Sequence, residues 1–222
     1  MKALSLVSSI LFRSWLWEAD WSGCEMSESA WPDDLFETLL TWKSEGLQTL
    51  PGGARRIGYV PHVGSEAYLH CIPAPLSTEE VQELEMSVGR TFRPEFKSFL
   101  RHANGLKVFS GALGIYGLRS NYAREPVSMA ASLPFDIRTP NVRERPKGLH
   151  ATDVVVGSYG EDGSEVVLKE NGSVIRVARR TGEELNGWPS FEYWLNAEVA
   201  RLCKMFDAKG RCLDNARILP TT

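Results

Sequence analysis

The chain has 222 residues, of which 43% are hydrophobic, and it carries a formal net charge of −3 at pH 7. A chain of this length can bury one sizeable core and still leave residues for an extension. It lacks the strongly basic composition of nucleic-acid-binding domains, so no direct nucleic-acid partner is predicted. The charge is uneven, because residues 1–72 hold five Lys and Arg against nine Asp and Glu, whereas residues 73–222 hold twenty against nineteen.

The N-terminal region is rich in tryptophan. Five of the seven tryptophans fall in the first 42 residues: Trp15, Trp17, Trp21, Trp31 and Trp42. The apolar run from Ala3 to Phe12 resembles a secretory signal only faintly, because Arg13 interrupts it and no small-residue cleavage site follows. It is also too short to span a membrane. Three interpretations stay open: a helix or hairpin packed on the main domain, an amphipathic segment that binds interfaces, and a misassigned start codon.

Residues 33–72 are expected to form a short helix followed by two strands. Asp33 and Asp34 favour the start of this helix, since carboxylates stabilise the positive end of the helix dipole. Its apolar face is expected to carry Leu35, Leu39 and Trp42. The ranges 57–60 and 67–72 are typical of strands, and Pro73 and Pro75 predict a domain boundary after them. Residues 1–72 are therefore interpreted as an N-terminal extension.

Residues 76–89 carry the pattern of a capped helix. Ser77 and Glu80 have the spacing of a capping box, in which each side chain accepts a hydrogen bond from the other residue's amide. Glycine at position 89 can supply the left-handed residue that ends such a helix. One face of the helix is expected to carry Val81, Leu84 and Val88.

A second helix is predicted to begin at Pro94, because proline at the first helical position loses no hydrogen bond. Its buried face is expected to carry Phe96, Phe99, Leu100 and Ala103. Asn104-Gly105 is predicted to end it. Two capped helices in this order, with such a short link, form the most informative pattern in the chain.

Beyond Asn104 the spacing changes from helical to strand-like. Candidate strands are 106–109, 112–118, 153–156, 165–169 and 173–177. Asn171-Gly172 between two β-branched runs is the strongest short signal for a hairpin. Ser190 is a good N-cap for a final helix with a continuous apolar stripe, which indicates core packing. Helices combined with an antiparallel meander predict an α+β fold.

The region from Leu76 to Gly105 resembles the signature of the SUKH superfamily, the Smi/Knr cell-wall-regulator domain. That signature is an acidic helix, a short link, and a Pro-x-aromatic-Lys-x-Phe-Leu helix closed by Asn-Gly. With the later strands and final helix, the resemblance covers residues 73–206 and leaves 207–222 as a loose tail. Phe92 and Arg93 depart from the leucine that is usual before the proline. The resemblance implies an α+β fold with a mainly antiparallel sheet flanked by helices.

The sequence carries no recognisable catalytic or metal-binding motif. The histidines are scattered: His62, His70, His102 and His150. Neither a Gly-x-Ser-x-Gly elbow nor a His-Glu-x-x-His motif is present. The cysteines lack the close pairs of zinc sites: Cys24, Cys71, Cys203 and Cys212. No enzyme activity, metal or cofactor is therefore predicted, and free thiols favour the reducing cytoplasm.

The resemblance implies a non-enzymatic protein-binding domain. For a compact bacterial member it implies an immunity protein that neutralises a co-encoded polymorphic toxin of nuclease or deaminase type by binding its C-terminal domain. Two alternatives stay open: a regulatory or scaffold protein of cell-wall signalling, and a small-ligand or peptide-binding module. Loop charges and aromatic anchors are the usual determinants of such binding. The candidate partner-binding residues are Arg119, Tyr122, Arg124, Glu161, Asp162 and Trp188.

Overall fold

The computed structural model describes residues 31–120, 122, 133–213 and 217–221. Its α-helices are α1 (Asp33–Leu39), α2 (Thr78–Val88), α3 (Pro94–Leu100) and α5 (Phe191–Cys203), and its other helical segments are the 3₁₀-helices η1 (Leu40–Glu45) and η2 (Phe109–Gly111) and the π-helix η3 (Thr139–Arg143). Its strands are β1 (Leu47–Thr49), β2 (Arg55–Tyr59), β3 (Tyr68–Ile72), β4 (Leu106–Val108), β5 (Leu113–Ile115), β6 (Val154–Tyr159), β7 (Glu165–Leu168), β8 (Val174–Val177) and β9 (Glu184–Trp188). Trp15, Trp17, Trp21, Cys24 and Arg124 lie outside the described residues.

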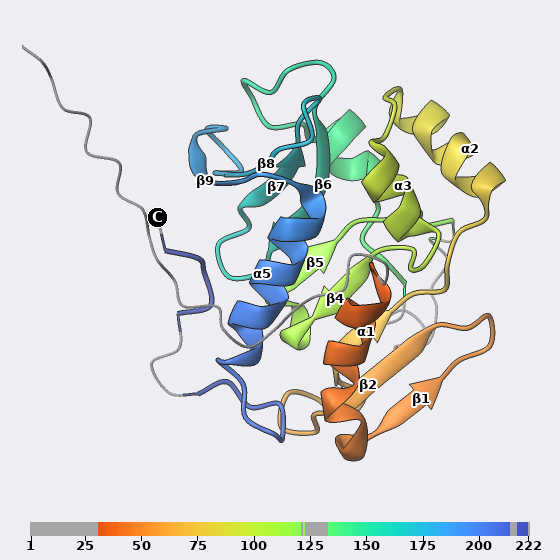
Figure 1. Ribbon diagram of the computed structural model, residues 1–222, viewed down its shortest axis with the longest axis vertical. Coiled ribbons are helices and arrows are strands. Elements are labelled where there is room, and N and C mark those ends of the chain that lie inside the picture. Colours follow the sequence, from red (N-terminus) through yellow and green to blue (C-terminus); the bar gives the residue numbers. More distant parts are fainter. Residues whose placement is uncertain (1–30, 121, 123–132, 214–216, 222) are drawn as a thin grey trace, which may run out of the picture.

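The strands form one antiparallel sheet in which each strand pairs with the next along the chain. This arrangement, with helices packed on it, confirms the predicted α+β fold (Figure 1). None of the described helices is both long and apolar enough to cross a membrane.

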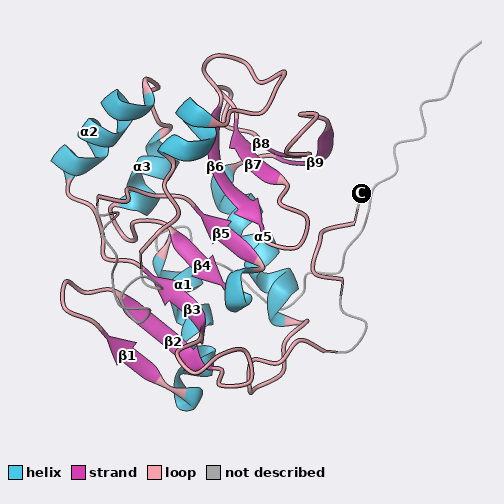
Figure 2. Cartoon of the chain, turned by 180° about the vertical axis from the view of Figure 1, so that it is seen from behind, coloured by secondary structure: helices cyan, strands magenta, loops and turns pink. Residues whose placement is uncertain are grey.

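An aromatic cluster joins three helices over one face of the sheet. The ring of Phe191 in α5 lies 5.3 Å from that of Phe96 and 5.6 Å from that of Phe99, both in α3. Phe36 of α1 lies 6.5 Å from Phe99, and all four side chains are buried. Figure 1 shows α1 and α5 in front of the strands, and the reverse view in Figure 2 shows the strands in front of them. The main core therefore lies between these helices and the sheet.

The two helices after β3 begin where the sequence predicts. Ser77 Oγ accepts a hydrogen bond from the Glu80 amide at 3.1 Å, and Glu80 Oε2 accepts one from the Ser77 amide at 2.8 Å. Gly89 ends α2 in the left-handed conformation, with φ of 70°. Pro94 occupies the first turn of α3. The capping box, the end of α2 at Gly89 and the start of α3 at Pro94 are therefore confirmed, whereas α3 ends at Leu100 and not at the predicted Asn104-Gly105.

Asn104 lies beyond the end of α3 and binds the chain that follows β5. Its side-chain amide donates to the Leu118 carbonyl at 2.8 Å, and its Oδ1 accepts from the Leu118 amide at 2.6 Å. A Cβ atom on Gly117 would lie 2.3 Å from Asn104 Oδ1, so only glycine allows this approach. The pair ties the end of the α2–α3 unit to the chain that leaves β5.

The N-terminal strands belong to the same sheet as the rest of the chain. Cys71 of β3 pairs with Lys107 of β4, and the hydrophobic core runs without interruption from Leu35 to Leu202. Two strands, β1 and β9, were not predicted. All residues of β1 are exposed and those of β9 are exposed or half-buried, so neither carries the apolar alternation that identifies a strand in a sequence. Both are edge strands.

Candidate functional site

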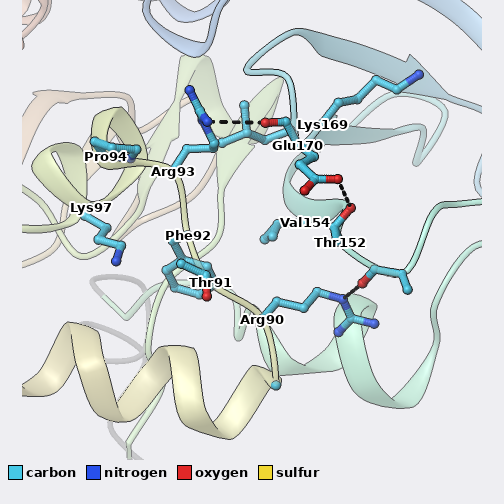
Figure 3. Close-up of a pocket in the computed structure, with 13 residues that line it drawn as sticks. Arg90, Thr91, Phe92, Arg93, Pro94, Lys97, Thr152, Val154, Lys169 and Glu170 are labelled. Carbon is cyan, nitrogen blue, oxygen red and sulfur yellow. Dashed lines mark hydrogen bonds between the residues drawn. The ribbon is translucent and has the colours of Figure 1, made fainter.

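A cleft of about 600 Å³ opens between the α2–α3 link and the neighbouring end of the sheet (Figure 3). One wall is formed by residues 89–94 and the first turn of α3. The other wall is formed by Ala151, Thr152 and Val154, at the start of β6, and by residues 168–170 at the β7–β8 turn. The second wall is fixed by the hairpin, in which Leu168 pairs with Val154 on one side and with Val174 on the other.

The α2–α3 link is held in place by Glu85 and by its own aromatic side chain. Glu85 Oε1 accepts a hydrogen bond from the Phe92 amide at 2.6 Å and lies 2.7 Å from Lys97 Nζ. The Phe92 side chain is buried, and its ring packs 5.3 Å from that of Phe96. One carboxylate therefore satisfies both a link amide and a lysine of the cleft.

Arg90 connects the two walls of the cleft. Its Nε donates to the Ala151 carbonyl at 2.9 Å, and its Nη1 donates to the carbonyls of Val88 and Asn141 at 3.0 and 3.1 Å. Figure 3 shows the guanidinium reaching across to the chain beside Thr152. Because the head group is bound to three carbonyls, Arg90 acts as a structural tie that leaves its charge at the cleft.

Arg93 makes a second bridge, on the other side of the cleft from Arg90. Its Nη1 donates to the Glu170 carbonyl at 3.3 Å, and its Nε lies 3.4 Å from Glu95 Oε1. The Glu170 carboxylate accepts a hydrogen bond from the Thr152 hydroxyl at 3.1 Å. The ammonium of Lys169 extends away from these residues in Figure 3. The opening of the cleft therefore presents Arg93, whose side chain is 44% exposed, and Lys169, which takes no part in the Arg93–Glu170 bridge.

The charged residues lining the cleft are mainly basic. They are Arg90, Arg93, Lys97, Lys169 and Glu170. Arginine forks and lysine ammonium groups bind carboxylates and phosphates by charge-assisted hydrogen bonds. The described lining includes no histidine, cysteine or aspartate, and its one carboxylate is bonded to Thr152. No group of three or more His, Cys, Asp or Glu side chains in the described part of the chain is placed to hold a metal ion. The arrangement is suited to binding an acidic group.

Residues 75–197 match the model of the SMI1 / KNR4 family (SUKH-1), which is more than half of the chain. The chain belongs to this family. No curated protein is a significant match to it. The SUKH-1 match contains both walls of the basic cleft, including α2, α3 and β6 to β8, whereas α1 and β1 to β3 precede it. The cleft is therefore a feature of the SUKH-1 part of the chain.

Two of the six partner-binding residues predicted for this SUKH-1 protein lie together after β5. The Arg119 guanidinium lies 5.3 Å from the centre of the Tyr122 ring, and the Tyr122 hydroxyl donates to Asp136. Arg138 binds the same carboxylate at 2.9 Å and donates to the Arg119 carbonyl at 2.6 Å. Tyr122 is 57% exposed, so this cluster presents an aromatic ring at the surface.

Glu161 and Asp162 follow the C-terminal end of β6, in the turn to β7. The Asp162 carboxylate binds the buried guanidinium of Arg176 at 2.6 Å and accepts from the Ser164 hydroxyl at 2.6 Å. Burial alone would raise the pKa of Asp162, but hydrogen bonds from Ser164 and Arg176 hold it below the ordinary value. Asp162 and Glu161 are both exposed, and Asp162 is engaged within the chain by Arg176 and Ser164.

Trp188 is half-buried at the end of edge strand β9, where its ring lies 6.4 Å from that of Trp194. It pairs with Val174, which pairs in turn with Leu168 of the cleft wall. The predicted residues that are described therefore fall in three places, and none of them lines the basic cleft. Their role in binding stays a prediction.

The basic residues of the cleft were not predicted as site residues. The available signal was the presence of two arginines, Arg90 and Arg93, in the short link between Gly89 and Pro94. Arg93 was noted only as a departure from the family pattern. Lys169 and Thr152 gave no signal, since only folding brings them beside the link.

Proposed function

We propose that this chain is an immunity protein that binds a co-encoded polymorphic toxin of nuclease or deaminase type and blocks its C-terminal catalytic domain. SUKH-1 membership supports the proposal, because the family resemblance implies this role for compact bacterial members. Neutralisation by covering an active site needs no reacting groups. It needs a rigid surface with complementary shape and charge.

The observation that carries the proposal is the preorganised basic cleft. Arg90 and Arg93 are already held by carbonyls of the opposite wall, so a partner would immobilise few additional side chains there. Less ordering on binding leaves more of the interaction energy as affinity. We expect the cleft to take an acidic segment of the toxin, with its carboxylates on Arg93 and Lys169.

The proposal places the protein in the cytoplasm of the toxin-producing cell. Cys71, Cys203 and Cys212 are free thiols, which is the usual state in a reducing compartment. Of the three, only Cys212 is exposed, so the described part of the chain offers a single thiol at its surface.

The test is affinity purification of the full chain from its own host, with partners identified by mass spectrometry. We expect one stoichiometric toxin C-terminal fragment, whose toxicity is suppressed when this chain is co-expressed. Recovery of many housekeeping proteins would favour a regulatory scaffold instead, and a co-purifying metabolite would favour a ligand-binding module.

The role of the cleft is tested by charge reversal once the toxin fragment is in hand. Arg93→Glu and Lys169→Glu together should weaken toxin binding by at least about tenfold, which corresponds to about 1.4 kcal/mol. Lys43→Glu and Lys209→Glu together reverse two exposed lysines outside the SUKH-1 match and change the net charge by the same amount, so this control should leave affinity within about twofold. Equal loss in both proteins would show that binding follows net charge and not the cleft.

A further inference from the structure

A second, smaller pocket of about 270 Å³ lies on the sheet beside the residues that follow β5. Its floor includes Ser158 of β6 and Glu165 of β7, which are direct partners in the antiparallel register. Tyr116 lines it just after the end of β5, and the segment from Phe135 to Glu144 contributes further lining residues. The arrangement places hydroxyl and carboxylate groups around one small space.

Glu165 is the unusual residue of this pocket, named here the Glu165 pocket. The residue is 2% exposed, and its Oε2 accepts no hydrogen bond from any described residue. Arg179 Nε lies 3.7 Å from Oε1, which is beyond hydrogen-bonding distance. Burying a carboxylate oxygen without a hydrogen-bond donor costs free energy. A ligand that supplied such a donor would remove this cost.

The charges around Glu165 are not balanced within the pocket. Arg179 also binds the exposed Glu144 at 2.7 Å, so a single guanidinium faces two carboxylates. The third carboxylate, Asp136, already has Arg138 at 2.9 Å. Burial raises the pKa of Glu165 to about 7, an effect that Glu144 strengthens and Arg179 opposes. A cation entering the pocket would reverse that shift.

We propose that the Glu165 pocket receives one guanidinium or ammonium group, presented by a basic side chain of a protein partner or by a small amine. The N–H groups would donate to Glu165 Oε2, and the hydroxyls of Tyr116 and Ser158 would accept the remaining ones. Burial raises the pKa of Tyr116 to about 12, so its hydroxyl stays neutral and adds no further charge.

The size of the pocket fits the end of one side chain. Its volume of about 270 Å³ lies below the range of roughly 300–1,000 Å³ of pockets for drug-sized ligands. Arg179 stands at its mouth with a side chain that is 55% exposed, so it can move aside without disturbing the core. The inference holds whether or not the partner is a toxin.

The test is NMR titration of the full chain with methylguanidinium chloride, following the side-chain carboxyl carbon of Glu165. We expect a saturable shift with a Kd in the millimolar range, as for a ligand of so few atoms. Tetramethylammonium chloride carries the same charge but no N–H donor, and it should give no saturable shift. An acetylated, amidated Gly-Arg-Gly peptide separates the two sources: tighter binding than methylguanidinium indicates a partner's side chain, and weaker binding indicates a small amine.

Glu165→Gln should weaken methylguanidinium binding by at least about tenfold, followed on the amides of Ser158 and Tyr116. Glu183→Gln, an exposed carboxylate in the β8–β9 turn, is the matched control and should keep the same Kd within about twofold. An unchanged Kd in Glu165→Gln, or no saturable shift in the unmodified chain, overturns the proposal.

A second measurement covers the case in which Glu165→Gln does not fold. The pKa of Glu165 in the unmodified chain should fall from about 7 when methylguanidinium saturates the pocket, and an unchanged pKa overturns the proposal. Both measurements use the isolated chain and small probes. Failure to capture a toxin therefore leaves this result unaffected, and failure here leaves the immunity proposal untouched.

Discussion

The basic cleft and the Glu165 pocket lie on one sheet but compensate their charges in opposite ways. In the cleft, Arg90 and Arg93 are bound to backbone carbonyls, and Lys97 is bound to Glu85. In the pocket, the buried Glu165 carboxylate has an oxygen with no described donor. Arg90, Arg93 and Lys97 therefore have partners within the chain, and the cleft would attract a binding partner by its charge. The Glu165 pocket contains a carboxylate oxygen that still needs a hydrogen-bond donor.

The two sites also differ in what supports them. The cleft wall formed by α3 packs against the aromatic core through Phe96 and Phe99, which are fully buried. The outer wall of the Glu165 pocket includes Phe135, whose side chain is 48% exposed. A site built on the core keeps its shape in the free protein. The Glu165 pocket depends in part on a side chain with less packing support.

The largest expected effect tests this difference in support. Phe99→Ala should lower the free energy of unfolding by about 3–5 kcal/mol, because it leaves a cavity between α3, α1 and α5. Phe135→Ala removes the same atoms from a half-exposed site and should cost less than about 1 kcal/mol. Urea denaturation monitored by circular dichroism measures both. Similar losses in the two variants would contradict the difference in support.

The next effect concerns pH and the Glu165 pocket. Burial raises the pKa of Glu165 from 4.5 to about 7, so between these values the folded state binds more protons than the unfolded state. The stability that Glu165 contributes is thus full below pH 4.5 and is lost as pH rises through 7. The loss is about 1.4 kcal/mol for each unit by which the two pKa values differ.

His70 acts in the opposite direction, so the pH test needs a difference measurement. Burial lowers the pKa of His70 to about 3, and its contribution falls as pH drops below 6.5. This contribution is common to the unmodified chain and to Glu165→Gln, and it cancels when their unfolding free energies are subtracted. The difference should decrease from pH 4.5 to 7 in denaturant titrations. A difference that does not change with pH would show that Glu165 titrates normally.

A smaller effect is expected at the carboxylate that completes the basic cleft. Glu85→Ala leaves the Phe92 amide and the Lys97 ammonium without their common acceptor and should cost about 1–3 kcal/mol of unfolding free energy. Glu83→Ala, at an exposed position on α2, is the control and should change stability by less than about 0.5 kcal/mol. If Glu85 behaves like Glu83, the link does not depend on that carboxylate.

The smallest effect is expected at the mouth of the Glu165 pocket. Glu144 and Arg179 form an ion pair in which both side chains are more than half exposed. Glu144→Gln should change the free energy of unfolding by less than about 1 kcal/mol, since solvent screens such pairs. Thermal unfolding at two salt concentrations measures it. A larger loss would show that the Glu144–Arg179 pair is screened by solvent less than its exposure indicates.

Local elements could be predicted because their determinants lie within a few residues. The capping box of Ser77 and Glu80, the left-handed Gly89 and the proline that starts α3 each act over one helical turn. The hairpin at Asn171-Gly172 likewise depends on adjacent residues, and Gly172 has a φ of 90°. These signals, with the order of helices and strands, were sufficient for the α+β fold and for the family.

The sequence by itself thus determined the helices, the main hairpin and the fold class, whereas the tertiary structure decided both sites. The strands β1 and β9 lack apolar alternation and exist because a neighbouring strand supplies their hydrogen bonds. The Arg90 bridge spans 61 residues to Ala151, and Glu165 begins a predicted strand in which nothing marks its carboxylate as buried. Burial and charge compensation depend on which distant segments pack together, and no spacing along the chain encodes that.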